Sequence, residues 1–194
     1  MIERRVAALR LQPGDVAIDC GANVGEVSAA LARTGADVHA FEPDPHAFST
    51  LVGRLGGKKN VRLYQQAVLD RAGRSRLYFH EDAVDDPVGG SVGSSLLAFK
   101  GNIDPERFVE VETIDLAQFV FGFDRRVRLI KIDVEGVECP LVHHLLDTGA
   151  IEHVDTVLVE VHDRHIPELQ AENQRLRERL ERDGFADRVL TDWA

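Results

Sequence analysis

The order of apolar and polar positions along this chain predicts a repeating succession of strands and helices. Short runs rich in β-branched residues, such as 16–20 and 127–132, are typical of buried strands. In 45–55 and 138–146 the apolar residues recur every three or four positions, which indicates helices with one buried face. The other expected elements are helices at 2–9, 26–32, 114–121 and 167–182, and strands at 38–41, 61–68, 75–80, 108–113, 156–162 and 185–190.

Because strands and helices alternate throughout, we expect a doubly wound, mainly parallel α/β sheet of the Rossmann-like kind, in a single domain spanning 1–194. Residues 81–105 interrupt the succession with acidic residues, Pro87, glycines and serines. Long loops without regular structure are uncommon in compact domains and often cover binding sites. We therefore expect a lid at 81–105, with a loop that has no binding role as the alternative.

Composition and charge limit the classes of partner. The chain has 194 residues, 44% of them hydrophobic, and a formal net charge of −10. The negative charge disfavours binding to nucleic acid and to anionic membranes. Residues 1–12 lack the apolar segment of a signal peptide, no run approaches a membrane span, and Cys20 and Cys139 form neither a C-x-x-C motif nor a disulfide framework. These features predict a cytoplasmic protein with reduced core thiols.

The first predicted strand ends in a glycine-containing turn that suits ligand binding. Asp19 closes the strand, and Gly21, Asn23 and Gly25 follow before the next helix. Dinucleotide-binding turns have glycine at the middle position, which lets backbone amides approach a diphosphate. Asn23 can adopt the left-handed backbone that the turn needs. Its side chain, however, makes the close approach of a diphosphate to the backbone amides less favourable than glycine would. The Asp19 carboxylate suits a ligand that carries ammonium and sulfonium charge.

A second acidic residue follows the next predicted strand. Glu42, with Pro43 after it, stands where a carboxylate is expected to accept hydrogen bonds from ribose hydroxyls. A ribose without a diphosphate indicates S-adenosylmethionine as the ligand, whereas a solvated acid at a strand end is the alternative role for Glu42. Gln66 and Ala67, at the end of the third predicted strand, are candidate adenine contacts, with plain packing as the alternative.

Several stretches together resemble a known family. They are 19–25, 41–43, 67–70, the Lys-Ile-Asp-Val-Glu-Gly-Val-Glu run at 131–138 and the Leu-Val-Glu-Val-His run at 158–162. In order and over nearly the whole chain, they resemble the FkbM-type S-adenosylmethionine-dependent methyltransferases. The resemblance implies a class I methyltransferase fold and transfer of a methyl group to a hydroxyl oxygen, in many members on a sugar or a polyketide.

The resemblance also implies roles for individual residues. Asp19, Gly21 and Asn23 would line the methionine part of the cofactor, Glu42 would hold the ribose, and Asp133 would stand beside the reacting centre. The acceptor would be a small molecule or an oligosaccharide. An exposed sheet edge would allow a second subunit to pair, so a homodimer is expected.

Methyl transfer to a hydroxyl requires a group that removes the proton. His144 and His162 are the candidate bases because an unperturbed imidazole is partly neutral at physiological pH; packing alone is the alternative role for each. Asp133 and Glu160, at the ends of adjacent predicted strands, are candidate ligands for Mg²⁺, which would acidify a bound hydroxyl. The alternative for Glu160 is a hydrogen bond to loop amides.

On the sequence alone, two hypotheses from other functional classes stay open. One is a nucleoside-binding protein without catalysis, and the other is an NAD-dependent oxidoreductase, which Asn23 and Asp19 disfavour. Nucleic-acid N-methyltransferases usually carry an Asp/Asn-Pro-Pro-aromatic turn after the fourth strand. The corresponding residues here are Asp133-Val134-Glu135-Gly136, so oxygen is the expected acceptor atom.

Overall fold

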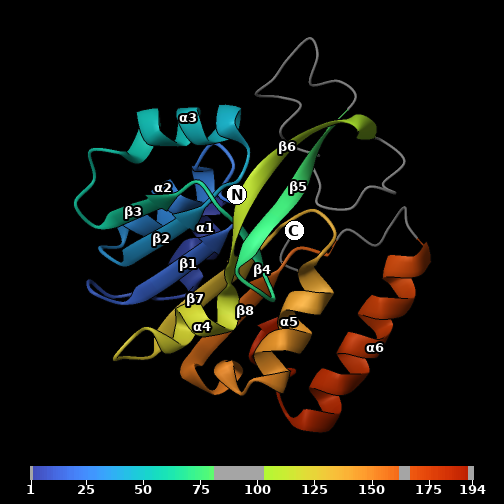
Figure 1. Ribbon diagram of the computed structural model, residues 1–194. Helices are drawn as coiled ribbons and strands as arrows, with labels where there is room; N and C mark the ends of the chain where they lie inside the picture. Colours follow the sequence, from blue (N-terminus) through green and yellow to red (C-terminus); the bar gives the residue numbers. More distant parts are fainter. Residues whose placement is uncertain (1, 81–102, 162–166, 192–194) are drawn as a thin grey trace.

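The main sheet has six strands, and all of its neighbouring strands run parallel (Figure 1). The computed structural model describes residues 2–80, 103–161 and 167–191. The strand order is β3-β2-β1-β7-β8-β9, which confirms the expected doubly wound α/β fold. The strands are β1 (Val16–Cys20), β2 (Asp37–Phe41), β3 (Val61–Tyr64), β7 (Val127–Ile132), β8 (Val154–Val159) and β9 (Val189–Leu190).

Helices cover both faces of the main sheet because its strands carry apolar side chains on both sides. On one face, Ala17 of β1 packs with residues of α1 (Ile2–Ala8) and α2 (Glu26–Arg33). On the other face, Ile18 packs with residues of α4 (Leu116–Phe121), α5 (Glu138–Asp147) and α6 (Pro167–Asp183). The part of the chain that the structure describes also contains α3 (Pro45–Leu55) and the 3-10 helix η3 (Ala150–His153).

A second, three-stranded sheet has the order β4-β6-β5. Its strand β6 (Ile103–Asp115) pairs parallel with β4 (Ala67–Leu69) and antiparallel with β5 (Gly73–His80). The single strand expected at 61–68 is therefore wrong, because it divides into β3 of the main sheet and β4 of the second sheet. β3 stops after Tyr64 because its neighbour β2 ends at Phe41, and Pro43 has no N–H with which to continue the pairing of the two strands.

Other expected boundaries also shift. Strand β6 begins at Ile103, inside the expected lid, while 81–102 lie outside the described residues. Helix α4 begins at Leu116, two residues later than expected, because the Asp115 side chain accepts a hydrogen bond from Gln118 N as its N-cap. The last strand, expected over 185–190, is reduced to β9, since backbone bonds from Arg188 N and Val189 N to Phe185 O make a turn before it.

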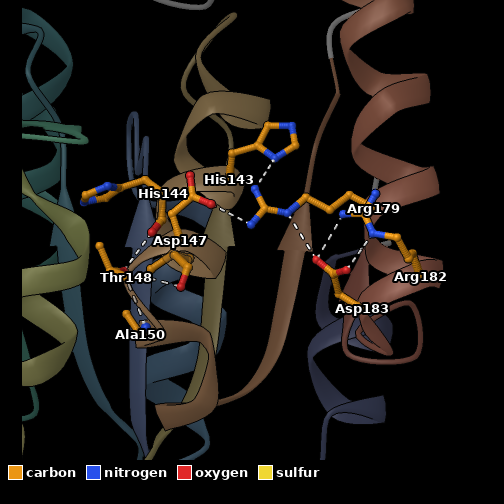
Figure 2. Close-up of polar contacts among 9 residues, drawn as sticks. His143, His144, Asp147, Thr148, Ala150, Arg179, Arg182 and Asp183 are labelled. Atoms are coloured by element: carbon orange, nitrogen blue, oxygen red, sulfur yellow. Dashed lines mark hydrogen bonds and ion pairs between the residues drawn. The ribbon is translucent and has the colours of Figure 1, made fainter.

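Polar contacts attach α6 to α5 (Figure 2). The Arg179 guanidinium donates to Asp147 Oδ1 at 2.6 Å, to Asp183 Oδ2 at 3.2 Å, and to His143 Nδ1 at 3.0 Å. A guanidinium has no acceptor, so His143 must present the lone pair of Nδ1. Burial and the charge of Arg179 lower the pKa of His143, which favours this neutral form.

Among the helices of the described ranges, none is long and apolar enough to cross a membrane.

Candidate functional site at the carboxyl edge of the sheet

The loop after β1 is packed directly against the end of β7. Gly21 has a φ of +79°, and a Cβ at this position would lie 1.7 Å from the carbonyl oxygen of Asp133. No side chain fits at that distance, so the close approach of the two backbones requires glycine. Gly21 N and Ala22 N both donate to Phe41 O, at 3.0 and 2.9 Å. The loop is thus fixed to the ends of both β2 and β7.

Glu42, at the end of β2, is a buried carboxylate beside this loop. Its side chain accepts hydrogen bonds from Asn23 N and Asp44 N, both at 2.8 Å. Asn23 adopts the left-handed conformation, with a φ of 48°, that directs its N–H to this carboxylate. Glu42 is only 7% exposed. Burial raises its pKa to about 7, although the two backbone hydrogen bonds oppose the shift.

A buried lysine joins the ends of β1 and β7. Lys131 lies opposite Asp19 in the parallel register of these strands. Its Nζ is 3.3 Å from Asp19 Oδ1 and 3.0 Å from Asp133 Oδ2, and it donates to Gly21 O at 2.8 Å. Asp19 Oδ2 accepts from the Ser28 hydroxyl on α2 at 2.6 Å. Ser28, Asp19, Lys131 and Asp133 therefore form a continuous polar chain, which we call the buried charge cluster.

The charges within this cluster compensate one another in part. The side chains of Lys131 and Asp19 are 4% and 0% exposed, whereas that of Asp133 is 25% exposed. Burial opposes the charge of Lys131, but Asp19 and Asp133 outweigh that effect and raise its pKa above the ordinary value. One ammonium group thus faces two carboxylates. Asp133 is the member of the cluster with appreciable exposed surface at the carboxyl edge.

The turn after β7 is shaped by Glu138, the first residue of α5. Its buried carboxylate accepts hydrogen bonds from Val134 N at 3.1 Å and from Gly136 N at 3.0 Å. These bonds hold Glu135 in the left-handed region, with a φ of 59°. Glu160 lies just beyond β8, and its N–H donates to Ile132 O at 2.9 Å. The turn therefore has a defined shape next to the Gly21 loop.

The structure brings together a large part of the residues expected to bind a cofactor. The carboxyl ends of β1, β2 and β7 gather Asp19, Gly21, Asn23, Gly25, Glu42, Pro43 and Asp133. Asp19 has no exposed surface, so its carboxylate would influence a ligand through its charge and through Lys131. Gln66 and Ala67 lie where the chain passes to the second sheet. Gln66 Nε2 donates to Glu112 at 3.1 Å, and Ala67 is buried.

The structure does not place the candidate bases beside the residues at the carboxyl ends of β1, β2 and β7. His144 Nε2 is 2.9 Å from Asp115 Oδ1, and it lies six residues into α5, about 9 Å along the helix axis from its first residue at 1.5 Å per residue. Burial opposes ionisation of Asp115, but hydrogen bonds from His144 and Gln118 N hold its pKa below the usual value. His162 lies outside the described residues. Catalysis by either histidine stays a prediction.

The structure adds no support to the expected magnesium site. Within 2–80, 103–161 and 167–191, no group of three or more His, Cys, Asp or Glu side chains is arranged to hold a metal ion. Asp133 Oδ2 instead faces the ammonium of Lys131. The pairing of Asp133 with Glu160 around Mg²⁺ stays a prediction.

Sequence reasoning missed three residues that shape this edge: Ser28, Lys131 and Glu138. Lysine inside the apolar run 127–132 was the available signal, because a buried lysine needs a partner. Its partner Asp19 lies 112 positions away on another strand, and only the β1–β7 register pairs them. Glu138 closes the 131–138 run that carries the family resemblance, but the sequence assigned it no role, and Ser28 carried no comparable signal.

Comparison with known proteins adds a family to this geometry. Residues 19–186 match the family model described as the methyltransferase FkbM domain. The crystal structure of the methyltransferase FkbM from Methylobacillus flagellatus KT is similar in fold, with a TM-score of 0.53 and 17% identity, over 90% of this chain and 40% of that one.

Three curated proteins are similar in sequence. The 31-O-demethyl-FK506 methyltransferase FkbM of Streptomyces tacrolimicus is 42% identical over 39% of this chain and 30% of its own length. The 2-O-methyltransferase NoeI of Sinorhizobium fredii is 28% identical over 73% of this chain and 61% of its own length. The hexuronic acid methyltransferase AglP of Haloferax volcanii is 28% identical over 76% of this chain and 56% of its own length. The chain thus spans between about a third and three fifths of each of these relatives.

Proposed function

Because the chain belongs to the FkbM methyltransferase family, we propose that it is an S-adenosylmethionine-dependent O-methyltransferase that acts on a hydroxyl group of a sugar-type acceptor. The site for the cofactor is the carboxyl edge formed by the Gly21 loop, Glu42 and Asp133. The names of two relatives, a 2-O-methyltransferase and a hexuronic acid methyltransferase, support oxygen as the acceptor atom and a sugar acid as the first acceptor class to test.

The observation that carries the proposal is the buried carboxylate of Glu42 beside the glycine-containing loop. Asn23 N and Asp44 N hold its two oxygens. Each carboxylate oxygen has more than one acceptor site, so the side chain retains capacity for the two donors of a ribose. In its ionised form Glu42 accepts hydrogen bonds from both ribose hydroxyls, which selects a ligand that carries a free cis-diol.

Asp133 faces the other end of the same loop. With Lys131 and Asp19 it leaves one net negative charge at the carboxyl edge, and its side chain is 25% exposed. Negative charge at this point suits the ammonium and sulfonium groups of the cofactor. S-adenosylmethionine supplies an electrophilic methyl group, and the protein has to align the acceptor oxygen with it and remove the hydroxyl proton.

For the proton we favour His162 over His144. His144 is bound to Asp115 partway along α5, whereas His162 follows Glu160 by two positions in the sequence, and the backbone N–H of Glu160 donates to Ile132 O at the end of β7. His162→Ala is expected to reduce methyl transfer by roughly 100-fold or more, the usual scale for a general base. His144→Ala should retain most of the activity. Equal losses in both variants, measured as S-adenosylhomocysteine release, would contradict this choice.

Calorimetric binding of S-adenosylhomocysteine tests the cofactor site. Wild type is expected to bind, and Glu42→Gln to bind roughly 10- to 100-fold more weakly, as for loss of a charged hydrogen-bond partner. Glu152→Gln, an exposed acid in η3, is the control and should bind like wild type. The proposal fails if wild type does not bind, and binding of NADH instead would favour an oxidoreductase.

A screen with labelled S-adenosylmethionine tests the acceptor. Glucuronic and galacturonic acids, their neutral parent sugars and simple oligosaccharides are the acceptors to compare. Alkali-stable label on the sugar is expected, because an O-methyl ether survives alkali and a methyl ester does not. Label confined to an ester would contradict hydroxyl methylation.

A further inference from the structure

Lys131 is a buried cation beside the proposed cofactor site that has no assigned role. Its side chain is 4% exposed, so it is poorly placed to contact a ligand directly. Within the described residues, its polar contacts are with Asp19, Asp133 and the Gly21 carbonyl, at the ends of β1 and β7, two of the strands that border the site. A role for Lys131 must therefore pass through one of these groups.

We propose that Lys131 is a positioning residue that holds the carboxylate of Asp133 in the orientation in which it meets the charged methionine end of the cofactor. The inference rests on the proposed function, because it assigns a role to Lys131 within that same site. Asp19 and the Gly21 carbonyl fix the ammonium group, and the ammonium group fixes Asp133.

The fixed side of this arrangement is well anchored. Asp19 is fully buried, and the Ser28 hydroxyl holds its second oxygen at 2.6 Å. A buried ammonium group is retained only where its charge and its hydrogen-bonding capacity are met. Asp19 meets the charge, and the Gly21 carbonyl, at 2.8 Å, accepts a hydrogen bond. Neither group can rotate toward solvent, so the position of Nζ is set by the strands.

Asp133 is the residue whose side-chain orientation depends on Lys131. It follows β7 directly, and its backbone N–H donates to Cys20 O at 3.1 Å, which fixes its main chain. Its side chain is more exposed than those of Lys131 and Asp19, so its rotamer depends on a partner that faces it. The 3.0 Å contact with Lys131 supplies a charged partner on the side of the Gly21 loop. Without the ammonium group, the carboxylate would be repelled by Asp19 and would turn away from the loop.

A double-mutant cycle tests this dependence through binding of S-adenosylhomocysteine. The four proteins are wild type, Lys131→Met, Asp133→Asn and the double variant. Each single change is expected to weaken binding roughly tenfold or more. The double variant should bind S-adenosylhomocysteine no more than about twofold more weakly than the single variant with the lower affinity. The effects of two residues that act through one another on binding are not additive. Lys131→Arg, which keeps the cation, should bind more tightly than Lys131→Met.

A purely structural role gives a different result. In that case Lys131→Met weakens binding by the same factor whether it is made in wild type or in the Asp133→Asn variant, and this outcome would overturn the inference, as would wild-type affinity in Lys131→Met. If Lys131→Met does not fold, the same cycle is run in the Asp19→Asn background, where removal of the lysine leaves one carboxylate instead of two. Failure of wild type to bind removes the proposed function itself, which separates the two failures.

Discussion

At the scale of single residues, the site depends on buried groups whose charge must be met inside the protein. Glu42 and the buried charge cluster have that property: Glu42 joins the end of β2 to the loop after β1, and the cluster joins β1 to β7, which is distant in the sequence. Glu42 is the clearest case, because burial raises its pKa to about 7 while its proposed role requires the ionised form. Its protonation therefore links ligand binding to pH.

Affinity for S-adenosylhomocysteine is expected to rise with pH through neutrality. Ribose hydroxyls donate to the ionised carboxylate, so binding favours loss of the proton, and affinity should be about tenfold weaker at about pH 6 than at about pH 8. Calorimetry in buffers of different ionisation enthalpy should show proton release on binding near pH 7. Glu42→Gln is the control and should show a flat profile; a wild-type profile that is equally flat would contradict the role of Glu42.

Gly21 supplies a prediction about stability. Gly21→Ala places a Cβ 1.7 Å from the Asp133 carbonyl oxygen, and the backbones must separate to admit it. Gly14 is the matched control, because its φ of +86° is similar and nothing lies within 4 Å of an added Cβ. Gly14→Ala should cost about 1–2 kcal/mol of unfolding free energy for the left-handed backbone. Gly21→Ala should cost about 1–3 kcal/mol more, and equal losses in denaturant unfolding would refute the close contact.

At the scale of elements, local signals in the sequence located helices and central strands well. Asp44 and Pro45 announce the start of α3, and in the structure Asp44 accepts from His46 N and Ala47 N with Pro45 in the first turn. The split between β3 and β4 falls at the polar pair Gln65-Gln66, but this pair alone does not show that the residues on either side of it join different sheets. Partner strands decided the break: β3 pairs with β2 in the main sheet, and β4 pairs with β6 in the second.

The attachment of α6 to α5 also depends on partners that the sequence does not pair. Arg179→Met is expected to lower the free energy of unfolding by about 1–2 kcal/mol, because Arg179 bonds His143 and Asp147 on another helix. Arg182→Met is the control, since Arg182 is largely exposed and bonds only its neighbour Asp183 in the contacts of Figure 2. Its effect should stay below about 0.5 kcal/mol. Thermal and denaturant unfolding measure the stability of the two variants. Equal losses of unfolding free energy would contradict the attachment of α6 to α5 by Arg179.

At the scale of the whole molecule, the order of strands decides where the chemistry lies. β1, β2 and β7 are neighbours in the sheet although β7 follows the others by more than 80 positions. The sequence predicts Asp19, Glu42 and Asp133 at strand ends, and the parallel order brings those ends to one edge. It could not predict that Lys131 would lie between Asp19 and Asp133, because that contact depends on the register of β1 with β7.

The proposed function requires that S-adenosylmethionine binds at this carboxyl edge. Backbone amide NMR on ¹⁵N-labelled protein, titrated with S-adenosylhomocysteine, tests it most directly. The amides of Gly21, Asn23, Asp44 and Asp133 should shift in proportion to ligand occupancy, whereas those of Glu152 and Arg182 should remain unchanged. A titration that leaves the first group unmoved while other amides shift would show that the ligand binds elsewhere and would contradict a cofactor site at this edge.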